Sequence, residues 1–444
     1  MTSVLPAFSP VRRVQTMLDV EVALAEALAE TGVIPPTSVA PIRNAARAER
    51  YDLVALDAEA TLAGNPVIPL VRHLTSAVAA EDPTAAGHVH WGATSQDVMD
   101  TALVLELREA GAGIAATLGR AGDAAARLAE RYAATPIAGR TWLQQATPTT
   151  FGAKAMVWMQ GLDRARARLL STLDAAGDLQ FGGATGSLST LGDAGPQVAA
   201  ALAAKLGLRA PAAAWHTERS RVADVACALG IACGTLGKIG RDVALLAQTE
   251  IGEVAEPTAE GRGGSSSMPH KRNPVASVRA VAAAVRAPGL VATMLAAMPQ
   301  EHERAIGGWQ AEWETLPELV ALAADASAAM ADTLAHLSVD EARMRANLDA
   351  AGGVARAEGL MAALAPRVGR VEAARLVEAA VRDAATRARG LAEVAQADQA
   401  IRKHLDTAAI EQALDPVALT ATARDIVRRS LRHREVDRRG HDHA

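Results

Sequence analysis

The stretch "RVADVACALGIACGTLGKIGRDVALL", residues 221–246, contains no proline, and its apolar side chains recur at alternating steps of three and four. These residues are Val222, Val225, Leu229, Ala232, Leu236, Ile239, Val243 and Leu246. The spacing is that of a heptad seam, and at 1.5 Å per residue the predicted helix is roughly 40 Å long. Ile231, Cys233 and Leu245 add apolar surface outside the seam, so the helix needs neighbours on more than one side. Its length favours a bundle shared between subunits over one within a single chain.

The composition extends this helical prediction to the whole chain of 444 residues. Half of the residues are hydrophobic and only 2% are aromatic, and the apolar content is mainly Ala, Leu and Val. Ala and Leu are strong helix formers, which predicts an all-α protein. The net charge of −5 is mild and argues against a nucleic-acid partner.

Two features bear on the compartment. Cys227 and Cys233 lie in the same predicted helix and are interpreted as core thiols. The N-terminus has no signal-type apolar run, and the apolar stretches are interrupted by Arg, Asp and Glu. We therefore expect a cytoplasmic protein without a membrane partner or a membrane-spanning segment.

Prolines and glycines divide the chain into segments. Proline-poor stretches predict helices over 14–31, 98–134, 152–194 (with a glycine-rich interruption at 181–187), 277–297 and 310–337. Long proline-free segments begin near residue 100, and shorter segments with prolines return near residue 350. We expect three regions, an N-terminal helical domain (1–100), a central long-helix bundle (101–350) and a C-terminal helical domain (351–444).

The run "GGSSSMPHKRNP", residues 263–274, places small residues beside concentrated positive charge. It is not a phosphate-cradling loop, because the residue before Lys271 is His270 instead of glycine. A surface linker is the simple alternative, but a linker does not need Pro269 or the basic and amide side chains behind it. An anion-binding loop is the other interpretation.

Three further polar segments interrupt the helical pattern: "HVHWGATSQDVMDT" (88–101), "GRTWLQQATPTTFG" (139–152) and "QEHERAIGGWQAEW" (300–313). They contain four of the six tryptophans, Trp91, Trp142, Trp309 and Trp313. Each one alone is a candidate for core packing, whereas the set suggests the walls of a pocket.

Two of these segments offer groups that bind carboxylates. Thr94 and Ser95 precede a predicted helix start, where hydroxyls and N–H groups either cap the helix or bind an anion. Arg304 stands beside His302 and Glu303, and it either forms an exposed ion pair or grips a carboxylate with two hydrogen bonds.

Together these segments resemble the fumarase/aspartase superfamily, whose hallmark "GSSxMPxKxNP" matches residues 264–274. Residues 92–97 and 146–148 match its other two regional patterns. The resemblance implies a three-region, mainly α homotetramer with a central long-helix bundle shared between subunits and active sites built from three subunits. It implies β-elimination or its reverse. The sequence has no metal-binding signature and no dinucleotide fingerprint, so we expect no metal and no cofactor.

The resemblance also assigns residue roles. Ser265 is the expected acid/base and Lys271 assists it, since an alkoxide is costly at neutral pH. Asn273 would hold a substrate carboxylate with Lys271. The other expected substrate-binding residues are His90, Thr94, Ser95, Thr141, Trp142, Gln145 and Arg304.

One departure from the superfamily narrows the reaction. Most members pair a histidine with a glutamate to protonate a leaving group; here those positions are Trp142 and Val278. A carboxylate leaving group needs no proton, which points to an enzyme that makes or breaks a lactone. The chain looks most like the superfamily's bacterial cycloisomerases, which implies closure of a small tricarboxylate into 4-carboxymuconolactone in protocatechuate breakdown, the β-ketoadipate pathway.

Two alternatives stay open. An adenylosuccinate lyase-like C–N lyase shares "MPHKRNP" and "QEHER" with this chain but needs the missing histidine and glutamate. A catalytically silent helical scaffold, as in the lens crystallins of the superfamily, does not explain the intact loop residues.

Overall fold

The computed structural model describes residues 5–258, 262–264, 267–268 and 270–441. Its secondary structure is almost entirely helical, so the all-α prediction is confirmed. Five long helices are present: α6 (Ser95–Arg131), α7 (Phe151–Ala175), α9 (Ser220–Leu246), α10 (Val275–Ala296) and α11 (Gly308–Ala335). Four of them agree with the predicted stretches, whereas the helix predicted over 152–194 ends at Ala175, before the glycine-rich interruption. All eight seam residues of α9 are buried, because the three-and-four spacing keeps them on one helix face.

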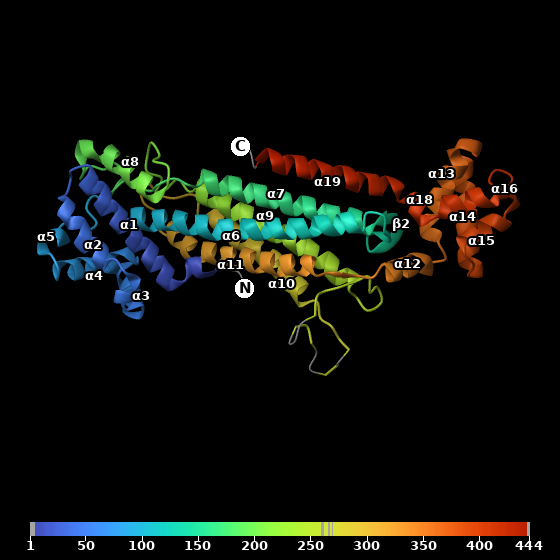
Figure 1. Cartoon of the computed structure of the whole chain (residues 1–444), viewed down its shortest axis with the longest axis horizontal. Coiled ribbons are helices and arrows are strands. Elements are labelled where there is room, and N and C mark those ends of the chain that lie inside the picture. Colours follow the sequence, from blue (N-terminus) through green and yellow to red (C-terminus); the bar gives the residue numbers. More distant parts are fainter. Residues whose placement is uncertain (1–4, 259–261, 265–266, 269, 442–444) are drawn as a thin grey trace. The chain divides into compact units, whose positions relative to one another are not determined.

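The chain divides into two compact units, and the divisions fall inside these five helices. Unit 1 comprises Met1–Leu118, Arg164–Gly234 and Ala282–Ala328. Besides its parts of the long helices it holds α1 (Pro10–Glu30), α2 (Val39–Ala45), α3 (Leu53–Ala63), α4 (Val67–Ala79), α5 (Pro83–Ala86), α8 (Gly195–Leu206) and the short 3-10 helices Leu5–Phe8, Pro36–Ser38, Ala48–Arg50 and Gly192–Ala194. Helix α1 packs against α2 and α8 (Figure 1). Its start is capped by Ser9, whose Oγ accepts a hydrogen bond from the Arg12 backbone N–H.

Unit 2 comprises Gly119–Asp163, Thr235–Val281 and Ala329–Ala444. It contains the antiparallel hairpin β1 (Pro136–Thr141) and β2 (Gln144–Thr150), and the short pair β3 (Val254–Ala255) and β4 (Ser338–Val339). The helices that follow are α12 (Glu341–Ala350), the 3-10 helix Val354–Arg356, α13 (Ala357–Val368), α14 (Arg370–Arg387), α15 (Leu391–Ala397), α16 (Gln399–Arg402), α17 (Thr407–Leu414), α18 (Pro416–Leu419) and α19 (Ala421–His441). Leucine, isoleucine, valine and alanine side chains of α13–α17 form a buried cluster of their own. The three regions expected from the sequence stay a prediction.

Two expectations about the apolar helices have different outcomes. Cys227 is half-buried and Cys233 is buried, and both are free thiols. Contrary to the expectation that Arg, Asp and Glu interrupt the apolar stretches, α9 and α10 are long and apolar enough to cross a membrane by length and composition alone, a test that a buried core helix also passes. The charges of α9 lie near its two ends and leave residues 225–237 uncharged. In α9 the apolar window is 61% buried, as the core helix of a bundle is.

Candidate active site

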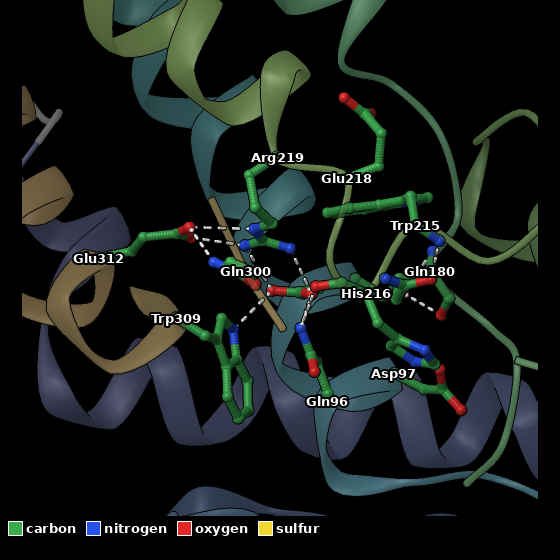
Figure 2. A network of polar contacts seen from close by, with 12 residues as sticks. Gln96, Asp97, Gln180, Trp215, His216, Glu218, Arg219, Gln300, Trp309 and Glu312 are labelled. Carbon is green, nitrogen blue, oxygen red and sulfur yellow. Dashed lines mark hydrogen bonds and ion pairs between the residues drawn. The ribbon is translucent and has the colours of Figure 1, made fainter. Parts of the chain in front are cut away.

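The segment before α6 is folded around the carboxylate of Asp97, which lies in the first turn of that helix (Figure 2). This carboxylate accepts hydrogen bonds from the backbone N–H groups of Thr94 (3.0 Å), Gly182 (3.0 Å) and Gly183 (2.9 Å), and it contacts His216 Nε2 at 2.7 Å. Asp97 therefore fixes the helix start to the glycine-rich interruption that follows α7.

Asp97, and not a hydroxyl, supplies the side-chain cap at this helix start. Within the described part of the chain, neither the Thr94 nor the Ser95 hydroxyl makes a hydrogen bond, and both residues are half-buried. The N-terminal end of α6 carries the partial positive charge of the helix dipole. Both hydroxyls are thus free to bind an anion at a site that favours negative charge.

Arg304 is hydrogen-bonded to the same turn and to the glycine-rich segment after α7. Its Nη1 donates to Gln96 Oε1 at 2.8 Å, and its Nη2 donates to the Ala184 carbonyl at 2.8 Å. Both acceptors are neutral, and among the described residues Arg304 makes no ion pair, unlike the exposed ion pair weighed from the sequence. A half-buried guanidinium without a carboxylate partner is suited to a carboxylate ligand.

The orientation of the Gln96 amide is fixed by hydrogen bonds on the side away from Arg304 (Figure 2). Gln96 is fully buried, and its Nε2 donates to Asp100 Oδ2 at 3.0 Å and to the His216 carbonyl at 2.8 Å. With both N–H bonds used there, Oε1 must face Arg304.

Asp100 is in turn held by a buried group of charges, of which Figure 2 labels Arg219 and Glu312. Arg219 donates to both of its carboxylate oxygens (2.7 and 3.1 Å) and to both oxygens of Glu312 (3.0 and 2.5 Å). Trp309 Nε1 donates to Asp100 Oδ1 at 3.1 Å. Burial lowers the pKa of Arg219, but Asp100 and Glu312 outweigh it and raise that pKa above its ordinary value. The cation is therefore permanent, and it is shared by two carboxylates.

The four tryptophans of the polar segments do not share one environment. Trp309 is buried and meets the half-buried Trp313 edge to face, with ring centroids 4.9 Å apart. The pocket-wall interpretation is wrong for Trp309, which packs in the interior and orients Asp100. Trp91 and Trp142 are exposed.

His90 stands four residues before Thr94 in left-handed backbone, with φ of 59°. Its Nδ1 lies 2.5 Å from Glu21 Oε1 on α1. Gly92 is also left-handed (φ 79°), and a Cβ there would meet the Leu191 side chain at 2.8 Å, so this turn requires glycine.

The predicted wall residue Trp142 lies at the tip of the β1–β2 hairpin in unit 2. Trp142 and Leu143 form a two-residue turn with φ of 54° and 64°, and they are 98% and 71% exposed. Such turns usually contain Asn and Gly, and left-handed backbone at a bulky residue costs about 1–3 kcal/mol. Strain that presents two apolar side chains to the outside is typical of a functional surface. The sequence did not predict this hairpin.

Close to its turn, the hairpin is anchored by the guanidinium of Arg140. Its Nη1 and Nη2 donate to the buried carboxylate of Glu253 at 2.8 and 2.7 Å. Asn347 Nδ2 donates to the same carboxylate at 2.9 Å. Gln145 Nε2 donates to the Asn347 carbonyl at 3.0 Å, so the Gln145 amide supports the turn. Thr141 is exposed and lies next to Trp142.

In the predicted anion-binding loop, residues 263–274, hydrogen bonds join the two ends. Asn273 donates from its backbone N–H to the Gly263 carbonyl at 2.9 Å, and from Nδ2 to the same carbonyl at 3.2 Å. Gly263 is left-handed, and a Cβ on it would meet Asn273 O at 2.6 Å. Lys271 is exposed. Ser265, the expected acid/base, lies outside the described residues.

The predicted site residues therefore fall into two groups. His90, Thr94, Ser95 and Arg304 belong to unit 1, whereas Thr141, Trp142, Gln145, Lys271 and Asn273 belong to unit 2. Sequence reasoning missed the groups that orient them: Glu21, Gln96, Asp97, Asp100, His216, Arg219 and Glu312. Gln96 and Asp97 stand in a quoted motif, but nothing in the local pattern marks Glu21 or Arg219. No group of three acidic, His or Cys residues suited to a metal occurs in the described part of the chain.

Comparison with known families agrees with this arrangement. A family model described as lyase matches residues 5–289, and one described as adenylosuccinate lyase C-terminus matches residues 353–430. The chain belongs to this lyase family, the fumarase/aspartase superfamily that its loop motif predicts.

Individual relatives are more specific. The chain is 51% identical over 424 residues to a 3-carboxy-cis,cis-muconate cycloisomerase of Pseudomonas aeruginosa, covering 96% of this chain and 92% of that protein. It is 42% identical over 438 residues to a nitrosuccinate lyase of Streptomyces davaonensis, covering 97% and 92%. Its fold matches the crystal structure of a 3-carboxy-cis,cis-muconate lactonizing enzyme from Pseudomonas putida with a TM-score of 0.92, 44% identity and coverage of 97% and 96%.

Proposed function

We propose that this chain catalyses the reversible lactonisation of 3-carboxy-cis,cis-muconate to 4-carboxymuconolactone, in the β-ketoadipate pathway. The observation that carries the proposal is the pair Trp142 and Val278. These residues occupy the positions where most of the superfamily has a proton-donating histidine and its glutamate. In the structure the Trp142 ring is held out on a strained, anchored turn, which suits it to form an apolar wall of the assembled site.

The reaction follows from the charges. One substrate carboxylate adds its oxygen to a carbon of the double bond, and the adjacent carbon takes a proton from Ser265. The group that departs in the reverse direction is a carboxylate, which is stable without protonation. Lys271 and Asn273 would stabilise the charge that develops on the carboxylate next to the protonated carbon. Arg304, Thr94 and Ser95 would hold another carboxylate at the start of α6.

We further propose a cytoplasmic homotetramer with no membrane or nucleic-acid partner, in which several subunits supply parts of each site. Helix α10 carries Val278, Val285 and Leu295 at exposures of 58%, 69% and 47%, an apolar stripe that a second copy of the chain would cover. Light scattering should give four times the mass of the 45.9 kDa chain. Val285→Glu should give smaller species, with Arg286→Glu as the matched control. A parent protein that is a stable monomer would contradict the shared site.

One ultraviolet assay tests the activity. Loss of the diene absorbance of 3-carboxy-cis,cis-muconate, with formation of the lactone, is the expected result. Turnover of adenylosuccinate without turnover of the muconate would support a C–N lyase instead. Turnover of neither would favour the silent scaffold.

A further inference from the structure

A buried glutamate outside every sequence motif contacts one of the expected substrate-binding residues. Glu21 lies on α1 with its side chain 1% exposed, and its Oε1 is 2.5 Å from His90 Nδ1. Its other oxygen, Oε2, is buried and has no hydrogen-bond partner. A buried carboxylate that has lost its water needs a cation to compensate its charge. The imidazole of His90 is the group in contact with it.

The backbone around His90 indicates that this contact is set by the fold. The residue adopts φ of 59°, and its carbonyl accepts a hydrogen bond from Ala93 N–H at 3.3 Å. Left-handed backbone at a residue with a side chain persists only where its surroundings enforce it, and such residues gather at binding sites. Here the turn lies four residues before Thr94, in the segment that leads into α6.

The charges around the ring come from two helices. Burial lowers the pKa of His90, but the Glu21 carboxylate, its hydrogen bond and Asp97 of α6 outweigh it and raise that pKa above its ordinary value. The Nδ1–H is used by Glu21. Among the described residues Nε2 has no hydrogen-bond partner, so one N–H remains for a ligand.

We propose that Glu21 is a positioning residue that holds His90 as a fixed imidazolium whose Nε2–H binds a substrate carboxylate. This inference rests on the proposed tricarboxylate substrate. A substrate with three carboxylates needs several cationic donors, and His90 supplies one whose charge and orientation are set before binding. Nε2 would donate a charge-assisted hydrogen bond to the carboxylate, and no proton is transferred.

The decisive variant is Glu21→Gln, which keeps the size and the acceptor oxygen but removes the negative charge. The His90 pKa should fall, so the imidazolium is lost at a lower pH than in the parent. We expect KM to rise roughly tenfold near pH 7.5, the loss of one charge-assisted hydrogen bond to the substrate, with much less change in kcat. Below the variant's His90 pKa its KM should return toward that of the parent.

The matched control is Glu26→Gln, which removes another ion-paired glutamate of α1, the partner of Arg43. It should leave the pH profile of KM unchanged. A second variant, His90→Gln, should raise KM at every pH and abolish the limb of the profile that Glu21→Gln shifts. This variant keeps the inference testable if Glu21→Gln does not fold.

Nuclear magnetic resonance of the histidine rings separates this inference from the proposed function. His90 should titrate at a lower pH in Glu21→Gln, and binding of tricarballylate, an inert tricarboxylate, should shift the His90 Nε2 signal. An unchanged His90 titration in Glu21→Gln, or no shift with tricarballylate, would overturn the inference. A parent protein that forms no lactone would overturn the proposed function and leave the His90 titration to be judged by itself.

Discussion

The start of α6 in unit 1 and the hairpin tip in unit 2 differ in burial and in how their side chains are held. At the start of α6, Asp97, Asp100 and Arg219 are buried and fully paired, and Arg304 is aimed by bonds within the unit. At the hairpin tip, Trp142 and Leu143 are exposed and strained, and they contribute nothing to the core of the chain. The side chains of the first region are held in place within the unit, whereas those of the hairpin tip have no such support. This difference agrees with the proposal of a site shared between subunits, in which the hairpin tip would pack against another copy of the chain.

The largest expected effect concerns proton transfer by Ser265, which belongs to neither of these two regions. Ser265→Ala should lower kcat by roughly two to four orders of magnitude, the usual contribution of a positioned acid/base, with little change in KM. Steady-state kinetics of lactone formation measure both constants. Ser266→Ala and Ser267→Ala are the matched controls, and near-normal turnover in Ser265→Ala would assign the proton to one of these two residues.

The paired region should be the more fragile of the two. Arg219→Met leaves the carboxylates of Asp100 and Glu312 buried without their cation, which costs about 3–5 kcal/mol for a broken buried pair. We expect a large fall in Tm and loss of activity through misplacement of Gln96. Arg221→Met, which removes a partly exposed partner of Asp178, should have a much smaller effect on Tm. Equal effects of the two variants would show that the buried charges are not special.

Loss of the Arg304 guanidinium should affect substrate binding more than the stability of the fold. Arg304→Met should lower kcat/KM by roughly ten- to a hundredfold, since a hydrogen bond to a charged group contributes about 1.5–3 kcal/mol. Tm should be nearly unchanged. Gln96→Met keeps the charge of Arg304 but removes the amide oxygen that orients its guanidinium. This variant should raise KM by less than Arg304→Met does. Unchanged kinetics in Arg304→Met would remove this residue from the site.

The smallest effect concerns the hairpin tip and the leaving group. Restoring the superfamily pair with Trp142→His and Val278→Glu should lower the rate of lactone formation by up to about tenfold, because an apolar wall is exchanged for an ionisable pair that must be desolvated. In the parent protein, the rate of lactone formation should show no pH dependence that is due to a group at position 142. A double variant that forms the lactone faster than the parent would show that the missing pair is a handicap, and the leaving-group argument would fail.

Much of the fold could be read from local periodicity. The seam of α9 follows from the spacing of its apolar residues, which acts over a few residues. The end of α7 at Ala175 did not follow from proline placement, because the proline-free stretch continues to residue 194. The hairpin could not be predicted in this way, because its turn has Trp142 and Leu143 where a hairpin signal needs Asn or Gly. The loop motif predicted the chemistry of residues 264–274 because its residues are contiguous, although Ser265 itself lies outside the described residues.

The sequence by itself determined the helical class, the superfamily and the identity of the expected substrate contacts, since each is written in neighbouring or periodic residues. Only the tertiary structure decided what orients those contacts. Gln96 and Arg304 are 208 residues apart in the chain, and Glu21 and His90 are 69 apart. A glutamate on an amphipathic helix looks the same in sequence whether it faces water or a buried histidine. Helix packing alone removes the water from Glu21, and its loss turns an ordinary side chain into one that fixes the charge of its neighbour.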